Sequence, residues 1–230
     1  MLVGLSGHLR NGAPNGGGGG GPPAPSFDTQ VLLHFDSTPL VESANGLTST
    51  ASGSGLDGTV SQFGPACWQM GGGNFRIDGL PDISALDWTM EWWWRLAGTG
   101  ARPGMYLRGT SDEERVTLGA QAAGGNNMVL IVRDSTGTAM LQIQFDADHT
   151  VDVFKHVAIS YDAATKTIYV GQAGAILYSS VLPNHPGEIN DLYHEETFGA
   201  AITRIDELRL ITGAALYKDT YIPPVAEFEV

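Results

Sequence analysis

The segment WTMEWWWR carries side chains that could hold a sugar. Trp93 has Glu91 two residues before it and Arg95 two residues after it. In an extended strand these three side chains share one face, because successive side chains alternate between the two faces. An indole ring can stack on the apolar face of a sugar while charged neighbours bond its hydroxyls. An exposed face would make this a carbohydrate site, whereas a covering loop, second layer or N-terminal arm would make Trp93 a packing residue.

Tyr193, followed by His194, is a second carbohydrate-binding candidate, in what reads as a long loop before Thr203. An exposed tyrosine ring offers the same stacking chemistry as an indole and adds a hydroxyl group. The loop itself has no pattern that fixes its conformation. Tyr193 is therefore a weaker alternative to Trp93 as a carbohydrate-binding residue.

Catalytic motifs are not evident in the sequence. Hydrolysis of a glycosidic bond needs two carboxylates that flank the bond. Asp206 and Glu207 are adjacent, so a regular strand would place them on opposite faces. We found no Gly-x-Ser-x-Gly elbow, phosphate-binding loop or His-Glu-x-x-His motif. The sequence predicts a protein that is not an enzyme, with a glycoside hydrolase as a remote alternative.

The charge balance argues against two classes of partner. The chain has 12 Lys and Arg residues against 25 Asp and Glu residues, a formal net charge of -13. Nucleic acids and anionic membranes bind proteins through clustered basic side chains, and here the basic residues are few and scattered. We therefore expect neither nucleic acid nor membrane as a partner. The single cysteine, Cys67, excludes an intrachain disulfide and reads as a small buried hydrophobic residue.

Residues 1–26 differ in composition from the rest of the chain. Six consecutive glycines, Gly16 to Gly21, and the prolines that follow them are typical of a linker. The apolar residues ahead of the linker are too few to form a core, and we expect them to anchor the arm to a neighbouring subunit: Leu2, Val3, Leu5 and Leu9. The first residues lack the basic start and long apolar stretch of a signal peptide.

Residues 27–230 show the pattern of short strands joined by turns. The clearest example is Trp88–Arg95, in which one face carries Trp88, Met90, Trp92 and Trp94 and the other carries Thr89, Glu91, Trp93 and Arg95. Further β-rich runs cover 31–35, 74–78, 128–133, 139–145, 155–161, 167–170 and 205–211. No long helical period interrupts them. The pattern predicts an all-β antiparallel sandwich or barrel behind an extended N-terminal arm.

Four segments resemble the concanavalin A-like, laminin-G-type (LamG) jelly rolls, especially those of tailed-phage structural proteins. They are LLHFD at 32–36, DWTMEWWWR at 87–95, the pair FKHVA at 154–158 and IYVG at 168–171, and IDELRL through AALY to IPP at 205–224. Each is weak alone, the last is the most specific of them, and their order and spacing together carry the resemblance. Two departures are Phe154 in place of the usual Trp, and Gly171-Gln172 in place of Asp-Gly.

The resemblance implies a two-sheet jelly-roll sandwich over 27–230. It also implies a structural calcium ion between the first strand and a C-terminal carboxylate, at positions that match Asp36 and Asp206. The alternative is that Asp36 opens a turn and Asp206 bonds the backbone. Calcium takes six to eight oxygen ligands, and the sequence does not complete such a set.

The function that the resemblance implies is that of a structural component of a phage virion, a head or tail decoration or fibre protein. We expect such a protein to be made in the host cytoplasm, to be anchored through its arm, and to contact other virion proteins and further copies of itself. The alternative is a carbohydrate-binding adhesin that attaches to host surface glycans.

Overall fold

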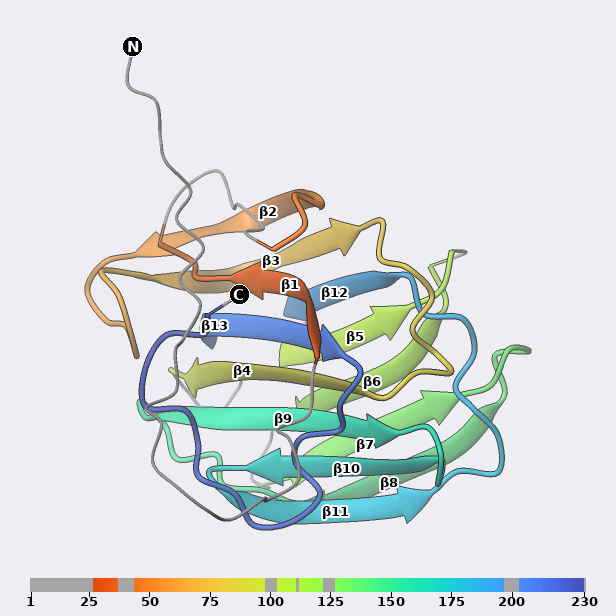
Figure 1. The fold of residues 1–230 in the computed structure, drawn as a ribbon. Coiled ribbons are helices and arrows are strands. Elements are labelled where there is room, and N and C mark those ends of the chain that lie inside the picture. The colour runs from red at the N-terminus through yellow and green to blue at the C-terminus, as the bar shows by residue number, and fades with distance from the viewer. Residues whose placement is uncertain are drawn as a thin grey trace, which may run out of the picture.

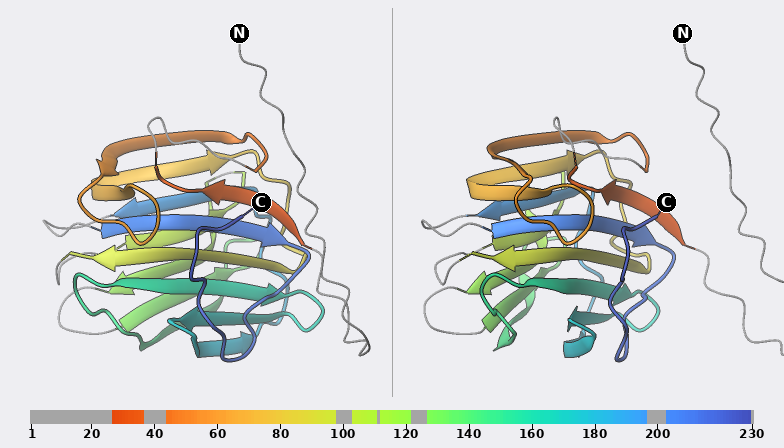
Figure 2. Two further views of the ribbon diagram at one scale, coloured as in Figure 1. Left: turned by 60° about the vertical axis from the view of Figure 1, so that its left-hand side comes forward. Right: turned by 90° about the vertical axis from the view of Figure 1, so that its left-hand side faces the viewer.

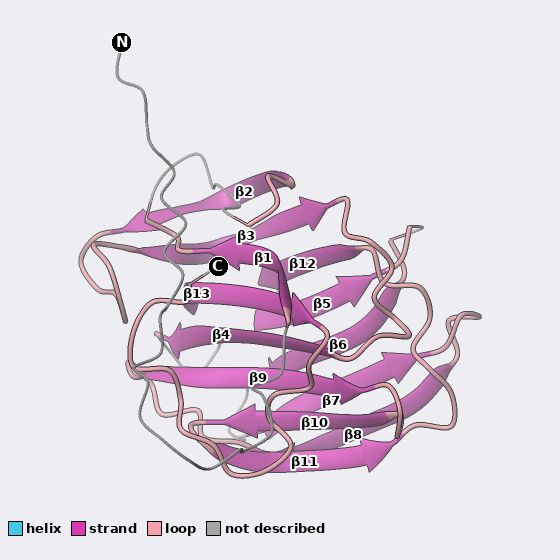
Figure 3. Ribbon diagram, viewed as in Figure 1, coloured by secondary structure: helices cyan, strands magenta, loops and turns pink. Residues whose placement is uncertain are grey.

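The computed structural model describes residues 27–36, 44–97, 103–110, 112–121, 127–196 and 203–229, without the side chains of residues 54, 121 and 196. The described residues form thirteen β-strands, in two layers that face each other (Figure 1). Strands and loops account for all of them, with no helix (Figure 3). The all-β antiparallel jelly-roll sandwich predicted from the sequence is confirmed. The predicted arm, with Leu2, Val3, Leu5 and Leu9, lies outside the described residues.

The front layer in Figure 1 contains eight strands. In chain order they are β1 (Asp28–Leu33), β2 (Thr48–Asp57), β3 (Cys67–Asp78), β4 (Trp88–Leu96), β9 (Phe154–Asp162), β10 (Thr167–Gln172), β11 (Ala175–Val181) and β13 (Thr203–Thr212). The back layer contains β5 (Pro103–Arg108), β6 (Glu114–Gln121), β7 (Asn127–Arg133), β8 (Ala139–Asp146) and β12 (Asp191–Glu196). All neighbouring strands pair antiparallel.

Strand β3 belongs to both layers. Its first part, up to Met70, pairs with β13 of the front layer. Its second part, from Asn74 onward, pairs with β12 of the back layer. The glycines between these two residues make the change of layer sterically feasible. A Cβ atom on Gly73 would lie 2.2 Å from the carbonyl oxygen of Ser52 on β2, so a larger residue cannot pack there without displacing backbone.

The core fills the space between the layers. On β4 the predicted inner residues Trp88, Met90, Trp92 and Trp94 are all buried, with the rings of Trp92 and Trp94 in edge contact at 5.9 Å. The edge strands β8 and β11 belong to opposite layers, and Phe145 stacks on Tyr178 across them with centroids 5.5 Å apart. The apolar period of two read from the sequence therefore marks the inner face correctly.

The segment after β13 covers the outer face of the front layer. We call residues 213–229 the C-terminal strap. It runs across β4, β9 and β10 and returns toward β1, as both views of Figure 2 show. Backbone bonds hold it down, because the amide of Tyr221 donates to the carbonyl of Gly174 at 2.9 Å and the amide of Phe228 donates to Glu207 at 2.9 Å. Among the described residues, no helix is long and apolar enough to cross a membrane.

Candidate functional site

Glu91 on β4 lies at the centre of a buried polar network beneath the strap. Its carboxylate accepts hydrogen bonds from the Arg209 guanidinium at 2.5 and 3.0 Å and from the Tyr217 hydroxyl at 2.5 Å, and it contacts His156 Nε2 at 3.0 Å. Burial opposes ionisation, but the bond to His156 and the charge of Arg209 hold the pKa of Glu91 below its usual value. Glu91 is fully buried and both of its carboxylate oxygens are bonded by protein side chains, as a structural anion requires.

Trp93 shares this outer face but does not offer the exposed ring that a carbohydrate platform needs. Only 8% of the residue is accessible, because Phe63 meets the indole edge-on at 5.7 Å and Leu32 and Phe228 complete a small apolar cluster. Arg95, the third member of the predicted site, forms an ion pair with Asp152 at 3.0 Å. A covering loop, one of the two alternatives that the sequence left open, lies over Trp93 and supports the packing role for this residue.

Asp36 and Asp206, the expected calcium ligands, hold that covering loop. Asp206 accepts hydrogen bonds from the amides of Gln62 and Phe63 at 2.6 and 3.0 Å, and the Asp36 carboxylate lies against Gly64. Burial raises the pKa of Asp206 to about 7. The Oδ1 atoms of both carboxyl groups are buried without a partner.

The described residues do not complete a calcium shell around these two groups. No three His, Cys, Asp or Glu side chains in the described ranges converge as metal ligands would. Calcium needs six or more oxygens. The backbone-bonding role of Asp206, which the sequence gave as the alternative, is the one this geometry supports, and calcium stays an expectation of the resemblance.

Asp206 and Glu207 both face the covering segments, which corrects the expectation that they lie on opposite faces. A β-bulge between Asp206 and Leu208 adds Glu207 as an extra residue with a φ of 48°. Glu207 then reaches His34 at 3.0 Å. Both residues are at most 1% accessible, because the loop with Phe63 and the C-terminal strap lie over them.

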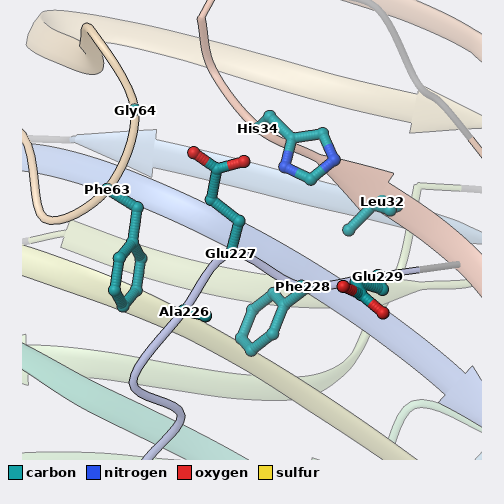
Figure 4. Close-up of a pocket in the computed structure, with 8 residues that line it drawn as sticks. All are labelled: Leu32, His34, Phe63, Gly64, Ala226, Glu227, Phe228 and Glu229. Carbon is teal, nitrogen blue, oxygen red and sulfur yellow. The ribbon is translucent and has the colours of Figure 1, made fainter.

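A hollow of about 660 Å³ opens next to this cluster, between the end of the strap and β1 (Figure 4). Its lining combines the rings of Phe63 and Phe228 with His34 and the exposed Glu227. Figure 4 shows the Glu227 carboxylate turned toward His34. The aromatic rings here pack on Leu32 and Trp93, so the hollow lacks a free ring for stacking.

The outer face of the back layer presents a different surface. Tyr193 lies on β12, in a strand and not in the loop that the sequence suggested, and its side chain is half-buried. Its neighbour His194 points into the core against Phe75 at 5.3 Å, where burial lowers its pKa to about 3. His194 is thus a neutral core residue and plays no part in a surface site.

Strand pairing aligns Tyr193 with five further residues across six strands. We call this set the tyrosine row: Arg76, Tyr193, Tyr106, Thr117, Ile131 and Gln142. Five strand spacings of about 4.8 Å make the row roughly 24 Å long. Such a length suits an extended chain ligand better than a single small molecule.

Tyr106 lies flat on the sheet within this row. A Cβ atom on Gly104 would fall 2.3 Å from the Tyr106 hydroxyl oxygen and 2.5 Å from the nearest ring atom, so the ring occupies the space that a side chain at Gly104 would need. Partial burial raises the pKa of Tyr106 to about 12. The ring stands 5.7 Å from that of Tyr193 at an angle of 49°. One face of Tyr106 thus rests on backbone while the residue remains partly accessible.

Arginine side chains flank the two tyrosines. The Arg108 guanidinium lies 3.6 Å above the Tyr193 ring, a cation–π distance. On the other side, Arg76 contacts Asp78, Asp112 and Asp191 at 2.5 to 2.6 Å. Sequence reasoning did not single out Tyr106, Gly104 or Arg108. The alternation of PGMYLR at 103–108, with Met105 and Leu107 facing inward, was the signal that could have found them.

Comparison with known proteins finds no family whose model matches this chain and no matching curated protein. Solved structures do match. The binding domain of botulinum neurotoxin serotype D superposes with a TM-score of 0.66 at 10% identity, over 83% of this chain and 49% of that one. The chain thus spans about half the length of the botulinum binding domains.

Two other matches are covered almost whole by this chain. The carbohydrate recognition domain of Emp47p gives a TM-score of 0.52 at 10% identity, over 82% of this chain and 97% of that one. Domain 4 of AbnA, a GH43 arabinanase of Geobacillus stearothermophilus solved with arabinotriose, gives 0.59 at 16% identity, over 83% and 95%. At these identities the matches establish the shared lectin-like jelly-roll fold, and they lend no support to the phage setting.

Proposed function

We propose that this chain is a non-catalytic carbohydrate-binding domain that holds an oligosaccharide along the tyrosine row. The observation that carries the proposal is the partly accessible Tyr106 ring, which packs over Gly104 in a row of outward-facing side chains. Sugars bind proteins through such a ring, which stacks on their apolar face, and through nearby groups that bond their hydroxyls. The exposed Gln142 supplies a polar neighbour along the row, whereas Arg76 is held by three aspartates and Thr117 is buried.

The structural neighbours favour this function over a virion component. Their names describe a receptor-binding domain, a carbohydrate recognition domain and a domain crystallised with arabinotriose. Host surface glycans, the alternative drawn from the sequence, therefore rank first as partners. A place on a virion, a host-cytoplasmic origin and assembly with further copies remain predictions of the sequence resemblance alone.

A binding experiment on the full chain tests the proposal. Binding to a panel of immobilised oligosaccharides that includes arabinotriose is followed by titration calorimetry with the best ligand. We expect Tyr106→Ala to weaken binding at least tenfold, since base–ring stacking of comparable area is worth about 1–3 kcal/mol. Tyr169→Ala is the matched control, because Tyr169 is an equally half-buried tyrosine on the front layer. We expect its affinity to stay within twofold of the unsubstituted chain.

A second variant separates the position of the ring from its presence. Gly104→Ala retains the Tyr106 residue but displaces its ring from the sheet, since the new methyl group would overlap the ring. We expect this variant to lose affinity almost as strongly as Tyr106→Ala. The proposal fails if the folded chain binds no glycan, or if the two variants bind as the unsubstituted chain does.

A further inference from the structure

A polar recess lies at the end of the tyrosine row, where β3 and β5 end and β12 begins. Figure 3 shows the loops at these strand ends, in pink, on one side of the molecule. The recess has a volume of about 230 Å³, and its polar lining is formed by Arg76, Asp78, Thr110, Asn190 and Asp191. Arg76 belongs to both the recess and the row, so the two features are continuous.

Arg76 fixes three carboxylates around this recess. Its Nε, Nη1 and Nη2 atoms contact Asp78 at 2.5 Å, Asp112 at 2.6 Å and Asp191 at 2.6 Å. Each of its nitrogen atoms therefore lies next to a carboxylate. The walls of the recess are therefore rich in oxygen acceptors, and these acceptors are fixed in position.

Asp191 has an acceptor that nothing in the protein satisfies. Its side chain is only 4% accessible, and its Oδ2 atom receives the Arg76 contact. Its Oδ1 atom is buried without a hydrogen-bond partner, in a residue that lines the recess. Burial raises the pKa of Asp191 against the charge of Arg76. A buried acceptor of this kind gains free energy from a donor that enters beside it.

We propose that the recess receives one uncharged sugar residue, whose hydroxyl group donates to Oδ1 of Asp191, while the rest of the glycan follows the tyrosine row. This inference rests on the proposed function and adds the chemical class of the ligand. Thr110 and Asn190 also line the recess; both donate to Glu188, at 3.1 and 3.3 Å, so their side-chain oxygens are the groups that could accept from further hydroxyls. A sugar hydroxyl both donates and accepts, which suits this mixed lining.

Charge decides between an uncharged sugar and other ligands. Four carboxylates, those of Asp78, Asp112, Glu114 and Asp191, surround only two guanidinium groups, those of Arg76 and Arg108. An acidic sugar would add a further negative charge here. A divalent cation would displace Arg76 from all three aspartates, and the described residues offer no converging set of three metal ligands.

The test uses two variants of the full chain. Asp191→Asn keeps an oxygen for Arg76 but replaces the free acceptor with an amide N–H group. Thr110→Trp fills the recess from its exposed rim without altering Asp191. Asp57→Asn is the matched control, because Asp57 is a buried aspartate paired with Arg204 at 2.7 Å outside the recess. Affinity for the best neutral oligosaccharide, its sialylated analogue and the neutral ligand in EDTA is measured by calorimetry.

We expect both recess variants to bind the neutral ligand about tenfold more weakly, the loss of about one hydrogen bond to a charged group. The control should stay within twofold, the sialylated analogue should bind more weakly, and EDTA should have no effect. Normal binding by folded Thr110→Trp would overturn the inference, as would preference for the acidic glycan or loss of binding in EDTA. If Tyr106→Ala loses affinity while both recess variants bind normally, the proposed function is supported and the inference about the recess is wrong.

Discussion

The two outer faces of the sandwich follow the same alternation of inward and outward side chains, but one face is covered and the other is partly accessible. On the front layer, Glu91, Trp93 and His156 point outward and are 0 to 8% accessible. On the back layer, Tyr106 and Tyr193 occupy equivalent outward positions and remain partly accessible. The difference comes from the covering segments, since the strap and the loop with Phe63 lie over the first face. Residue type alone therefore does not distinguish an anchor from a binding surface.

The chemistry of the covered face is consistent with its burial. Its carboxylate Glu91 is bonded by Arg209, His156 and Tyr217, so charge is compensated as burial requires. On the open face, Arg108 and Glu114 stand 3.9 Å apart in a looser pair. A buried network can contribute much to stability only when every group is satisfied, whereas a solvated pair contributes little.

The largest expected difference between the faces concerns their glutamates. Glu91→Ala removes the acceptor of a buried network and leaves Arg209 unpaired, so we expect a loss of about 3–5 kcal/mol in the free energy of unfolding. Glu114→Ala on the open face should cost less than about 1 kcal/mol. Urea unfolding of both variants measures the contrast. Equal effects would mean that the strap does not seal the front face.

The aromatic residues give the next contrast. Trp93→Ala would leave a cavity between Phe63 and Phe228, and we expect it to destabilise the fold by about 3 kcal/mol while glycan affinity stays unchanged. Thermal unfolding and calorimetry on the same sample give both values. A folded Trp93→Ala that loses its glycan would return the site to the front face.

Asp206 on the covered face should give the fold a pH-dependent stability. The pKa of Asp206 is raised to about 7 in the fold, above the usual value of the unfolded chain, so the folded state holds the proton more tightly. Stability should then fall as pH rises from about 4 through 7, by on the order of 4 kcal/mol.

Asp206→Asn isolates that contribution from the neighbouring carboxylates Asp36 and Glu207, whose pKa values are also raised by burial. The amide cannot ionise but can still accept from the amides of Gln62 and Phe63. The difference between the unfolding curves of the variant and the parent should therefore grow with pH. A constant difference from pH 5 to pH 8 would contradict the raised pKa.

The sequence predicted the inner faces of the strands but not what covers their outer faces. The period of two in Trp88–Arg95 placed Trp92 inside and Trp93 outside correctly, because it reflects local backbone geometry. Coverage of Trp93 depends on Phe63 and Phe228, which are 30 and 135 residues away in the chain. No local pattern encodes such contacts. The same holds for the bulge at Glu207, which the pairing of three strands imposes.

Tyr106 shows the opposite case, in which the local pattern contained the answer. Gly104, Tyr106 and Arg108 alternate with buried Met105 and Leu107. What the pattern could not give is the lateral neighbour, because the register that sets Tyr106 beside Tyr193 joins β5 to β12 across more than 80 residues. A site built across strands becomes visible only when the register is known.

The smallest expected effect tests whether the open face is as loosely held as its accessibility suggests. Gly104→Ala should change the free energy of unfolding by no more than about 1 kcal/mol, because the alanine lowers the entropy of the unfolded chain while the displaced ring loses its backbone contact.

The Tyr106 ring should also become more exposed in Gly104→Ala. Since burial raises the pKa of Tyr106 to about 12, its hydroxyl in the variant should ionise nearer to the ordinary tyrosine value of about 10. A difference titration of phenolate absorbance up to pH 11, variant against parent, should show one additional tyrosine ionising. Identical titrations with intact glycan affinity would mean that the ring keeps its place by other contacts, and that the open face is more rigid than its exposure implies.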